Sequence, residues 1–160
     1  MIDSLAYRKT LGQFATGVIV VTTSIEGAYL GVTVNSFTSV SLDPPLVLFC
    51  LDKKAQTAQS FLDAHHFAFN ILSEAQEEIS NYFARSNKKD FSNIPFDLCE
   101  GNTPMLRETL GVIQCKKHDV FDGGDHHIII GEVIKLSYDE ENVKKPLLYY
   151  SGKYNKILTI

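Results

Sequence analysis

The hydrophobic positions of this chain form short runs of strand length, separated by polar turn residues. Such runs predict β-strands. The predicted strands cover residues 18–23, 28–34, 46–51, 67–72, 111–120, 126–138, 147–151 and 154–158. Two turns, Glu26-Gly27 and Asp122-Gly123-Gly124-Asp125, join neighbouring runs as hairpins. Strands joined mainly by hairpins predict an antiparallel barrel, closed or nearly closed, rather than a doubly wound parallel sheet.

Three segments have the spacing or the end signals of short helices. They cover residues 4–15, 57–64 and 74–84. The third helix begins with a capping box, because Ser73 and Gln76 have the required spacing. From residue 85 to residue 103 the chain is polar and interrupted by Asn, Asp, Gly and Pro, which predicts a long loop over the surface.

The composition fits one domain of ordinary size. With 160 residues, the chain is long enough to bury a core, and we expect a single domain over residues 1–160. Cys50, Cys99 and Cys115 have no paired metal-ligand or redox spacing, which indicates reduced thiols in a cytoplasmic protein. No signal sequence and no hydrophobic run of roughly 20 residues occurs, so no membrane partner is expected. A net charge of -4 without a basic stripe argues against nucleic-acid binding.

The most informative segment covers residues 31–46. Small hydroxyl side chains alternate with hydrophobic ones from Thr33 to Ser41, and Pro44-Pro45 interrupts ladder pairing before the next strand. Such a segment can present several hydrogen-bond donors to one flat ligand. The residues alone also allow a Ser/Thr-rich loop between two core strands, since hydroxyls commonly bond nearby backbone in turns.

This segment resembles the signature of the short-chain flavin reductase family. These FMN-binding split-barrel proteins include the reductase components of two-component flavin monooxygenases. Three further blocks follow the family's order and span nearly the whole chain: Leu11-Gly12-Gln13-Phe14-Ala15-Thr16-Gly17-Val18, Gly124-Asp125-His126 and Pro146-Leu147-Leu148-Tyr149-Tyr150. The resemblance implies a mainly β fold, an antiparallel, Greek-key-like split β-barrel with a few short helices.

A bound FMN needs hydrophobic cover for its ring, partners for its heteroatoms, and a site for its phosphate. The segment from Thr33 to Ser41 suits the first two needs. Residues 52–57 suit the phosphate, because a strand there ends in two lysines and then opens a helix. An exposed turn with two solvated lysines is the alternative, and Ala55 stands where the family usually carries serine. Together with the helix end at residues 83–85, which resembles a Phe-Ala element of the family, the predicted cofactor contacts are Thr33, Val34, Asn35, Ser36, Ser39, Val40, Ser41, Cys50, Leu51, Asp52, Lys53, Lys54, Thr57, Phe83, Ala84 and Arg85.

His126 is the predicted catalytic residue. It follows a tight Gly-Gly turn at the mouth of a strand, where an imidazole can donate to a ligand near neutral pH. The residues alone also allow it to face solvent or to bond local backbone, whereas the family resemblance implies a place beside the nicotinamide. No glycine-rich dinucleotide motif or P-loop occurs, so we expect NAD(P)H to fold over a bound flavin. No metal site is predicted, because His65, His66 and His118 lack companions at ligand spacing.

The resemblance implies an NAD(P)H:flavin oxidoreductase. Such an enzyme transfers a hydride from NAD(P)H to FMN, or to FAD, and supplies reduced flavin or electrons to a partner monooxygenase or another acceptor. It also implies a homodimer with the flavin at the subunit interface. Two alternatives remain open: a flavoredoxin-like FMN carrier that takes no hydride from nicotinamide, and a related split-barrel flavoenzyme that acts on a small organic substrate.

Overall fold

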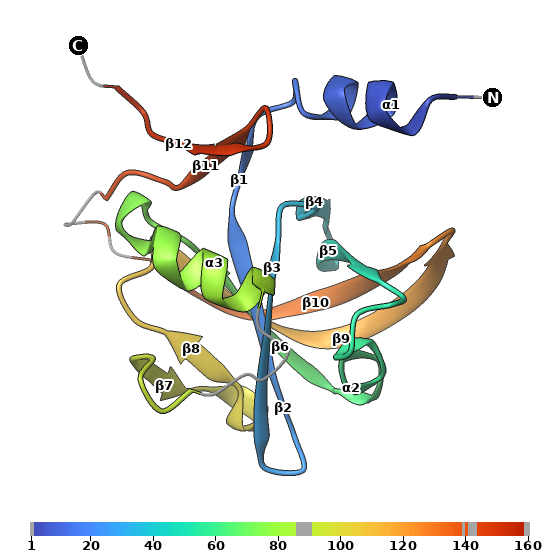
Figure 1. The fold of residues 1–160 in the computed structure, drawn as a ribbon. Coiled ribbons are helices and arrows are strands. Elements are labelled where there is room, and N and C mark those ends of the chain that lie inside the picture. The colour runs from blue at the N-terminus through green and yellow to red at the C-terminus, as the bar shows by residue number, and fades with distance from the viewer. Residues whose placement is uncertain (1, 86–90, 139, 141–143, 159–160) are drawn as a thin grey trace.

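The computed structural model describes residues 2–85, 91–138, 140 and 144–158, and Figure 1 shows its elements. The helices are α1 (Ser4–Leu11), α2 (Ala58–Asp63) and α3 (Glu77–Arg85), with short 3-10 turns at Glu74–Gln76 and Glu100–Asn102. The strands are β1 (Thr16–Gly17), β2 (Ile19–Ile25), β3 (Ala28–Val34), β4 (Thr38–Leu42), β5 (Pro45–Asp52), β6 (His66–Ile71), β7 (Phe96–Leu98), β8 (Pro104–Leu106), β9 (Gly111–Gly123), β10 (His126–Tyr138), β11 (Leu148–Tyr150) and β12 (Lys153–Asn155).

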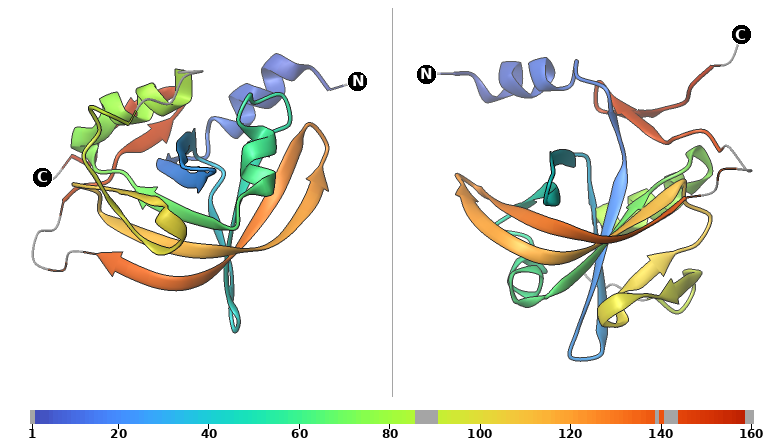
Figure 2. Two further views of the ribbon diagram at one scale, coloured as in Figure 1. Left: turned by 90° about the horizontal axis from the view of Figure 1, so that it is seen from below. Right: turned by 180° about the vertical axis from the view of Figure 1, so that it is seen from behind.

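Seven strands form one antiparallel sheet in the order β3-β2-β6-β9-β10-β5-β4. The long β9–β10 hairpin curves around one side, so that the sheet wraps over its own inner face (Figure 2). The mainly β, antiparallel split-barrel fold that the sequence predicts is confirmed. The alternative of a Ser/Thr-rich loop between β3 and β5 holds only in part, because residues 38–42 pair with β5 as strand β4, which was not predicted.

Ser36 joins β5 to the chain that leaves β3. Its hydroxyl accepts a hydrogen bond from the Cys50 N–H at 2.9 Å and donates to the Cys50 carbonyl at 3.2 Å. One side chain therefore makes the two bonds that a paired strand residue would make. The split in the barrel is bridged at this point.

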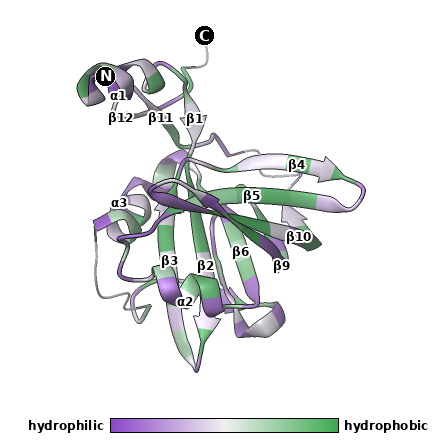
Figure 3. Ribbon diagram, turned by 90° about the vertical axis from the view of Figure 1, so that its right-hand side faces the viewer, coloured by the Kyte–Doolittle hydropathy of each residue, from purple (hydrophilic) through white to green (hydrophobic). Residues whose placement is uncertain are grey.

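The inner face of the sheet carries the main hydrophobic core. Phe49 lies at its centre and makes edge-to-face contacts with Phe61, Phe67 and Phe69, with ring centroids 5.5–6.0 Å apart. Cys115 is buried in the same core, and burial raises the pKa of its thiol to about 12. The hydrophobic residues of β2 and β5 are visible as green bands in Figure 3.

A second layer covers the outer face of β2, β3 and β6. It consists of α3 and residues 91–106, and it encloses a second core around Phe83 and Phe91. The predicted capping box is present at the entry to α3, since the Ser73 N–H bonds the Gln76 side chain at 3.1 Å. The surface loop predicted over residues 85–103 is partly right for the described part, because most of these residues are exposed; however, Phe91 and Thr103 are buried and β7 pairs with β8.

Asn70 ties this outer layer to the sheet. The side chain is fully buried; its amide donates to the Val20 carbonyl at 2.9 Å, and its oxygen accepts the Leu106 N–H at 2.8 Å. A buried amide with both ends paired fixes the position of the covering segment, because any shift would leave polar groups unpaired.

Helix α1 stands apart from the barrel, beside the small sheet β1-β11-β12 (Figure 1). It ends at Leu11 rather than at the predicted residue 15, since the Gly12 carbonyl accepts the Ser151 N–H at 2.8 Å. None of its residues is buried. Among the described residues, no helix is long and hydrophobic enough to cross a bilayer.

We expect Asn70→Ala to lower the free energy of unfolding by about 3 kcal/mol, because the Leu106 N–H and the Val20 carbonyl lose a buried partner. Urea denaturation measures this change. The matched control is Asn81→Ala on α3, whose exposed amide bonds only the Glu77 carbonyl and whose loss should cost less than about 0.5 kcal/mol. Equal effects of the two substitutions would show that the Asn70 network does not hold the layer in place.

Candidate cofactor site

Three contacts connect the predicted site residues into one continuous strip. The Thr33 hydroxyl donates to the Ser80 carbonyl of α3 at 2.6 Å. Ser36 bonds the backbone of Cys50 on β5, as described above. At the end of β5, the Lys53 N–H donates to the Asp125 carbonyl at 3.0 Å. The strip therefore runs from α3 across the β3–β4 connection and along β5 to the β9–β10 turn.

The polar side chains of the β3–β4 segment divide into two sets. Thr33 and Ser36 are engaged within the chain itself. Asn35, Ser39 and Ser41 make no side-chain hydrogen bond to any residue that the structure describes, and Asn35 and Ser39 are exposed. The second set therefore holds the donors that are available to a ligand, with the half-exposed Val40 between the two serines.

The end of β5 gathers charge. Asp52 accepts the Lys54 N–H at 2.8 Å, which forms a tight turn, and the Lys53 ammonium lies 2.6 Å from Asp122. This contact holds the pKa of the Asp122 carboxyl below its usual value. The Lys54 ammonium makes no hydrogen bond or ion pair within the described ranges, although its charge, after the hydrogen bond from His126, also lowers the pKa of the Asp125 carboxyl. The Thr57 hydroxyl makes no hydrogen bond to a described residue. Of the three residues predicted to hold a phosphate, Lys54 and Thr57 are thus free to do so, whereas Lys53 is paired.

His126 lies at the same end of the sheet. It stands opposite Asp52 in the β5–β10 register, and its Nδ1 is 2.7 Å from an oxygen of Asp125. This hydrogen bond lowers the pKa of the Asp125 carboxyl. Because the bond occupies Nδ1, the other ring nitrogen, Nε2, is the one left to face a ligand.

The remaining predicted residues are placed less directly. Phe83 is buried, and its ring lies so close to Gly31 that a Cβ on that glycine would come within 2.6 Å of it. Leu51 is buried in the inner core. Ala84 and Arg85 are exposed at the end of α3 and line a cavity of about 510 Å³ together with residues of the β11–β12 hairpin. Phe83 and Leu51 are thus almost wholly buried, and neither offers a surface to a cofactor in this structure.

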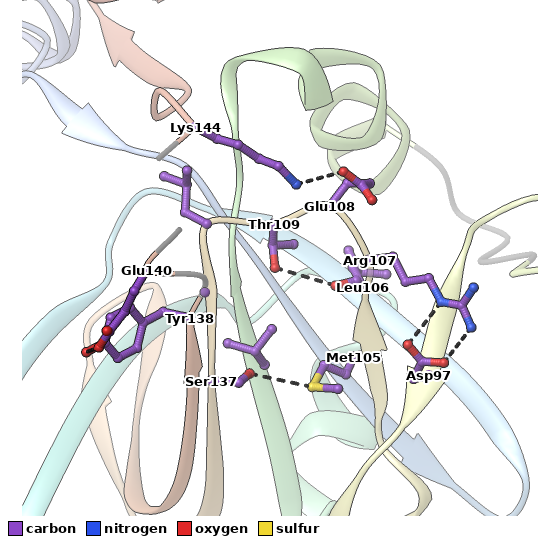
Figure 4. Close-up of a pocket in the computed structure, with 13 residues that line it drawn as sticks. Asp97, Met105, Leu106, Arg107, Glu108, Thr109, Ser137, Tyr138, Glu140 and Lys144 are labelled. Atoms are coloured by element: carbon purple, nitrogen blue, oxygen red, sulfur yellow. Dashed lines mark hydrogen bonds and ion pairs between the residues drawn. The ribbon is translucent and has the colours of Figure 1, made fainter. Parts of the chain in front are cut away.

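An open pocket lies away from the strip. It measures about 610 Å³ and is lined from β7, β8, β9 and the far end of β10, with the ion pairs Arg107–Asp97 and Lys144–Glu108 at its rim (Figure 4). Tyr138 in this cavity is separated from His126 by the whole of β10, about 40 Å of extended strand. The cavity therefore belongs to the opposite end of the hairpin.

Two acidic residues were missed as site residues by sequence reasoning. Asp122 pairs with Lys53, and Asp125 bonds His126. The turn itself was predicted, but nothing local in the sequence indicates that it lies against the end of β5. A carboxylate directly before the predicted histidine was the one available signal for Asp125.

The donors left unused on the strip fit a flavin mononucleotide. Unpaired amide and hydroxyl groups lie along its middle, a half-exposed valine offers hydrophobic contact, and a free lysine with a free threonine hydroxyl lies at one end. These match the heteroatoms, the ring and the phosphate of the ligand in kind.

Comparison with known proteins gives the family. Residues 11–158 match the family described as a flavin reductase like domain. The chain belongs to this family. It is 37% identical over 154 residues to the FMN reductase (NADH) SmoA of Agrobacterium fabrum, covering 96% of this chain and 86% of that relative. It is 45% identical over 132 residues to a probable flavin reductase of Rhizobium meliloti, covering 82% of this chain but only 42% of that relative.

A solved structure shares the whole fold. Nitrilotriacetate monooxygenase component B from Mycobacterium thermoresistibile superposes with a TM-score of 0.92 at 40% sequence identity, covering 98% of this chain and 87% of that one.

We expect Thr57→Ala to weaken FMN binding while leaving riboflavin, which lacks the phosphate, nearly unaffected. A hydrogen bond to a charged group contributes about 1.5 to 3 kcal/mol, so the FMN dissociation constant should rise about 10- to 150-fold. Titration followed by flavin fluorescence measures both ligands. Thr57→Ser keeps the hydroxyl and is the control, and an equal loss for FMN and riboflavin would place the phosphate elsewhere.

Proposed function

We propose that the protein is an NAD(P)H-dependent flavin reductase that takes FMN as its flavin. The bound flavin would supply the hydride acceptor: it would take a hydride from NAD(P)H, which would leave as NAD(P)+, and a proton from solvent would complete the two-electron reduction. The single observation that carries the proposal is the strip itself, which joins unused donors, a free lysine and His126 in a chain of this family. The Agrobacterium relative, an FMN reductase that uses NADH, supports the choice of substrates.

The residues of the strip bind and orient the reactants. The bound flavin supplies the electron acceptor, and hydride transfer needs close, aligned rings and little water more than it needs an acid or a base. Asn35, Ser39 and Ser41 hold the edge of the ligand, and Lys54 with Thr57 holds its charged end. The Nε2 atom of His126 is left available by the Nδ1 contact with Asp125, and this histidine would orient the nicotinamide.

Reduced flavin then passes to a partner. We propose a flavin-dependent monooxygenase for this role, on the support of the Mycobacterium structure, which is named as a monooxygenase component. The exposure of Asn35, Ser39 and Lys54 supports release of the flavin between the two proteins, because no described segment covers them.

We expect His126→Ala to bind FMN much as the parent does but to be reduced by NAD(P)H at least about tenfold more slowly, because only an interaction with the reacting complex changes this rate. Anaerobic stopped-flow absorbance measures the reduction. Dithionite reduction serves as the control and should be unchanged. If neither nicotinamide reduces the parent flavin, the protein is an FMN carrier; if the variant reacts as fast as the parent, His126 is only a turn residue.

We further propose that the protein is a homodimer. Leu5, Tyr7, Leu11 and Phe14 on and beside α1 are 55–77% exposed, although hydrophobic residues at this density normally pack against something. A helix of 8 residues is too short to be stable without such packing. We propose that a second copy of the chain packs against these hydrophobic residues, with the exposed strip close to the interface.

The dimer is tested by placing negative charge among the exposed hydrophobic residues on and beside α1. We expect Leu11→Asp combined with Phe14→Asp to halve the mass found by sedimentation and to weaken FMN binding, because two buried carboxylates would have to be desolvated at the interface. Arg8→Asp on the same helix reverses a charge at an exposed position and should leave the dimer intact. A parent that sediments as a monomer and binds FMN normally contradicts the proposal.

A further inference from the structure

Lys53 holds the β9–β10 turn at two places. Its backbone N–H donates to the Asp125 carbonyl at 3.0 Å, and its ammonium lies 2.6 Å from Asp122. The tip of the turn consists of Gly124 and Asp125, between the paired residues Gly123 and His126. Lys53 therefore bonds one residue of the tip, Asp125, and one residue of the strand that leads into it, Asp122.

The turn needs such support because its backbone is intrinsically permissive. Gly124 has φ +79°, a conformation that glycine adopts easily and leaves easily, and nothing lies within 4 Å of where its Cβ would be. The second oxygen of Asp122 accepts the Gly124 N–H at 3.1 Å. Asp122 thus bonds both Lys53 and the Gly124 N–H. Asp125 accepts the Lys53 N–H through its carbonyl and holds the imidazole of His126 through a 2.7 Å hydrogen bond of its side chain.

The same geometry argues against Lys53 as the phosphate ligand. To reach a phosphate, the ammonium would have to leave Asp122, and the Lys53 side chain is only 32% exposed whereas that of Asp122 is 78% exposed. The neighbouring Lys54 is exposed, and its ammonium makes no ion pair with a residue of described position; its attraction to the Asp125 carboxyl acts at longer range. The free lysine is therefore better placed for the phosphate than the engaged one.

We propose that Lys53 and Asp122 form a clamp that positions His126 for the nicotinamide, and that Lys54 provides the positive charge toward the flavin phosphate. The clamp rests on the proposed function, since His126 would contact a nicotinamide only if the protein is a flavin reductase. Lys53 and Asp122 are positioning residues, and they act through the turn rather than on the reacting atoms.

The kinetic test uses Lys53→Ala, Asp122→Ala and the charge-swapped double variant Lys53→Asp/Asp122→Lys. An exposed ion pair is worth at most about a fivefold change, so each single variant should slow anaerobic reduction at subsaturating NADH by about two- to fivefold. The swap should recover most of this loss. The ratio of FMN to riboflavin affinity should stay at the parent value in all three, whereas Lys54→Ala should lower it.

A matched control is available at the other end of the hairpin. Arg107 and Asp97 form an ion pair of the same length, 2.6 Å, and Arg107→Ala should leave the reduction rate at the parent value. If Lys53→Ala instead weakens FMN but not riboflavin while Asp122→Ala does not slow reduction, Lys53 is a phosphate ligand and the clamp is wrong.

Amide hydrogen exchange tests the clamp without any catalysis. In the flavin-free protein, the Lys53 and Gly124 amides are bonded to Asp125 and Asp122, so both should exchange faster when either clamp residue is replaced by alanine. Unchanged exchange at both amides overturns the clamp. Faster exchange together with a parent flavin that NAD(P)H does not reduce would support the clamp and reject the proposed function.

Discussion

The pairing of β5 with β10 is the interaction on which the candidate site depends. It sets Asp52 opposite His126 and so brings the segment that ends in two lysines against the turn that carries the histidine. The register is held by the buried faces of both strands, because Phe49 and Ile129 stand opposite each other and both point into the inner core. A shift by one residue would turn these side chains outward, so the core fixes the geometry of the site.

The two faces of the sheet are packed, whereas the strip of candidate site residues is exposed at its middle. The inner core is closed by aromatic contacts around Phe49, and the outer face is closed by a layer fixed through Asn70. Neither layer covers the strip, whose middle presents Asn35 and Ser39 to solvent. Stability therefore comes from two packed faces, while the middle of the strip stays exposed.

Polar side chains of one short segment serve two purposes here. Thr33 and Ser36 satisfy backbone carbonyls, and in doing so they hold α3 and β5 in place. Ser39 and Ser41, a few residues later, have no such partner among the described residues. The same kind of division occurs between two adjacent lysines, since Lys53 pairs with Asp122 while Lys54 makes no ion pair with a described residue. Side chains engaged within the fold and side chains left unbonded are thus interleaved along the chain.

The sequence by itself determined the local elements and the family. Hydrophobic runs and turn residues predicted β2, β3, β5, β6, β9 and β10, the capping box predicted the start of α3, and the order of the motifs indicated a flavin reductase. Only the tertiary structure decided which polar groups are free. Lys53 and Asp122 are 69 residues apart, and no local pattern records that they meet. The physical reason is that backbone preference depends on neighbours in sequence, whereas the partner of a hydroxyl or an ammonium depends on strand order and register, which the packing of the whole core sets.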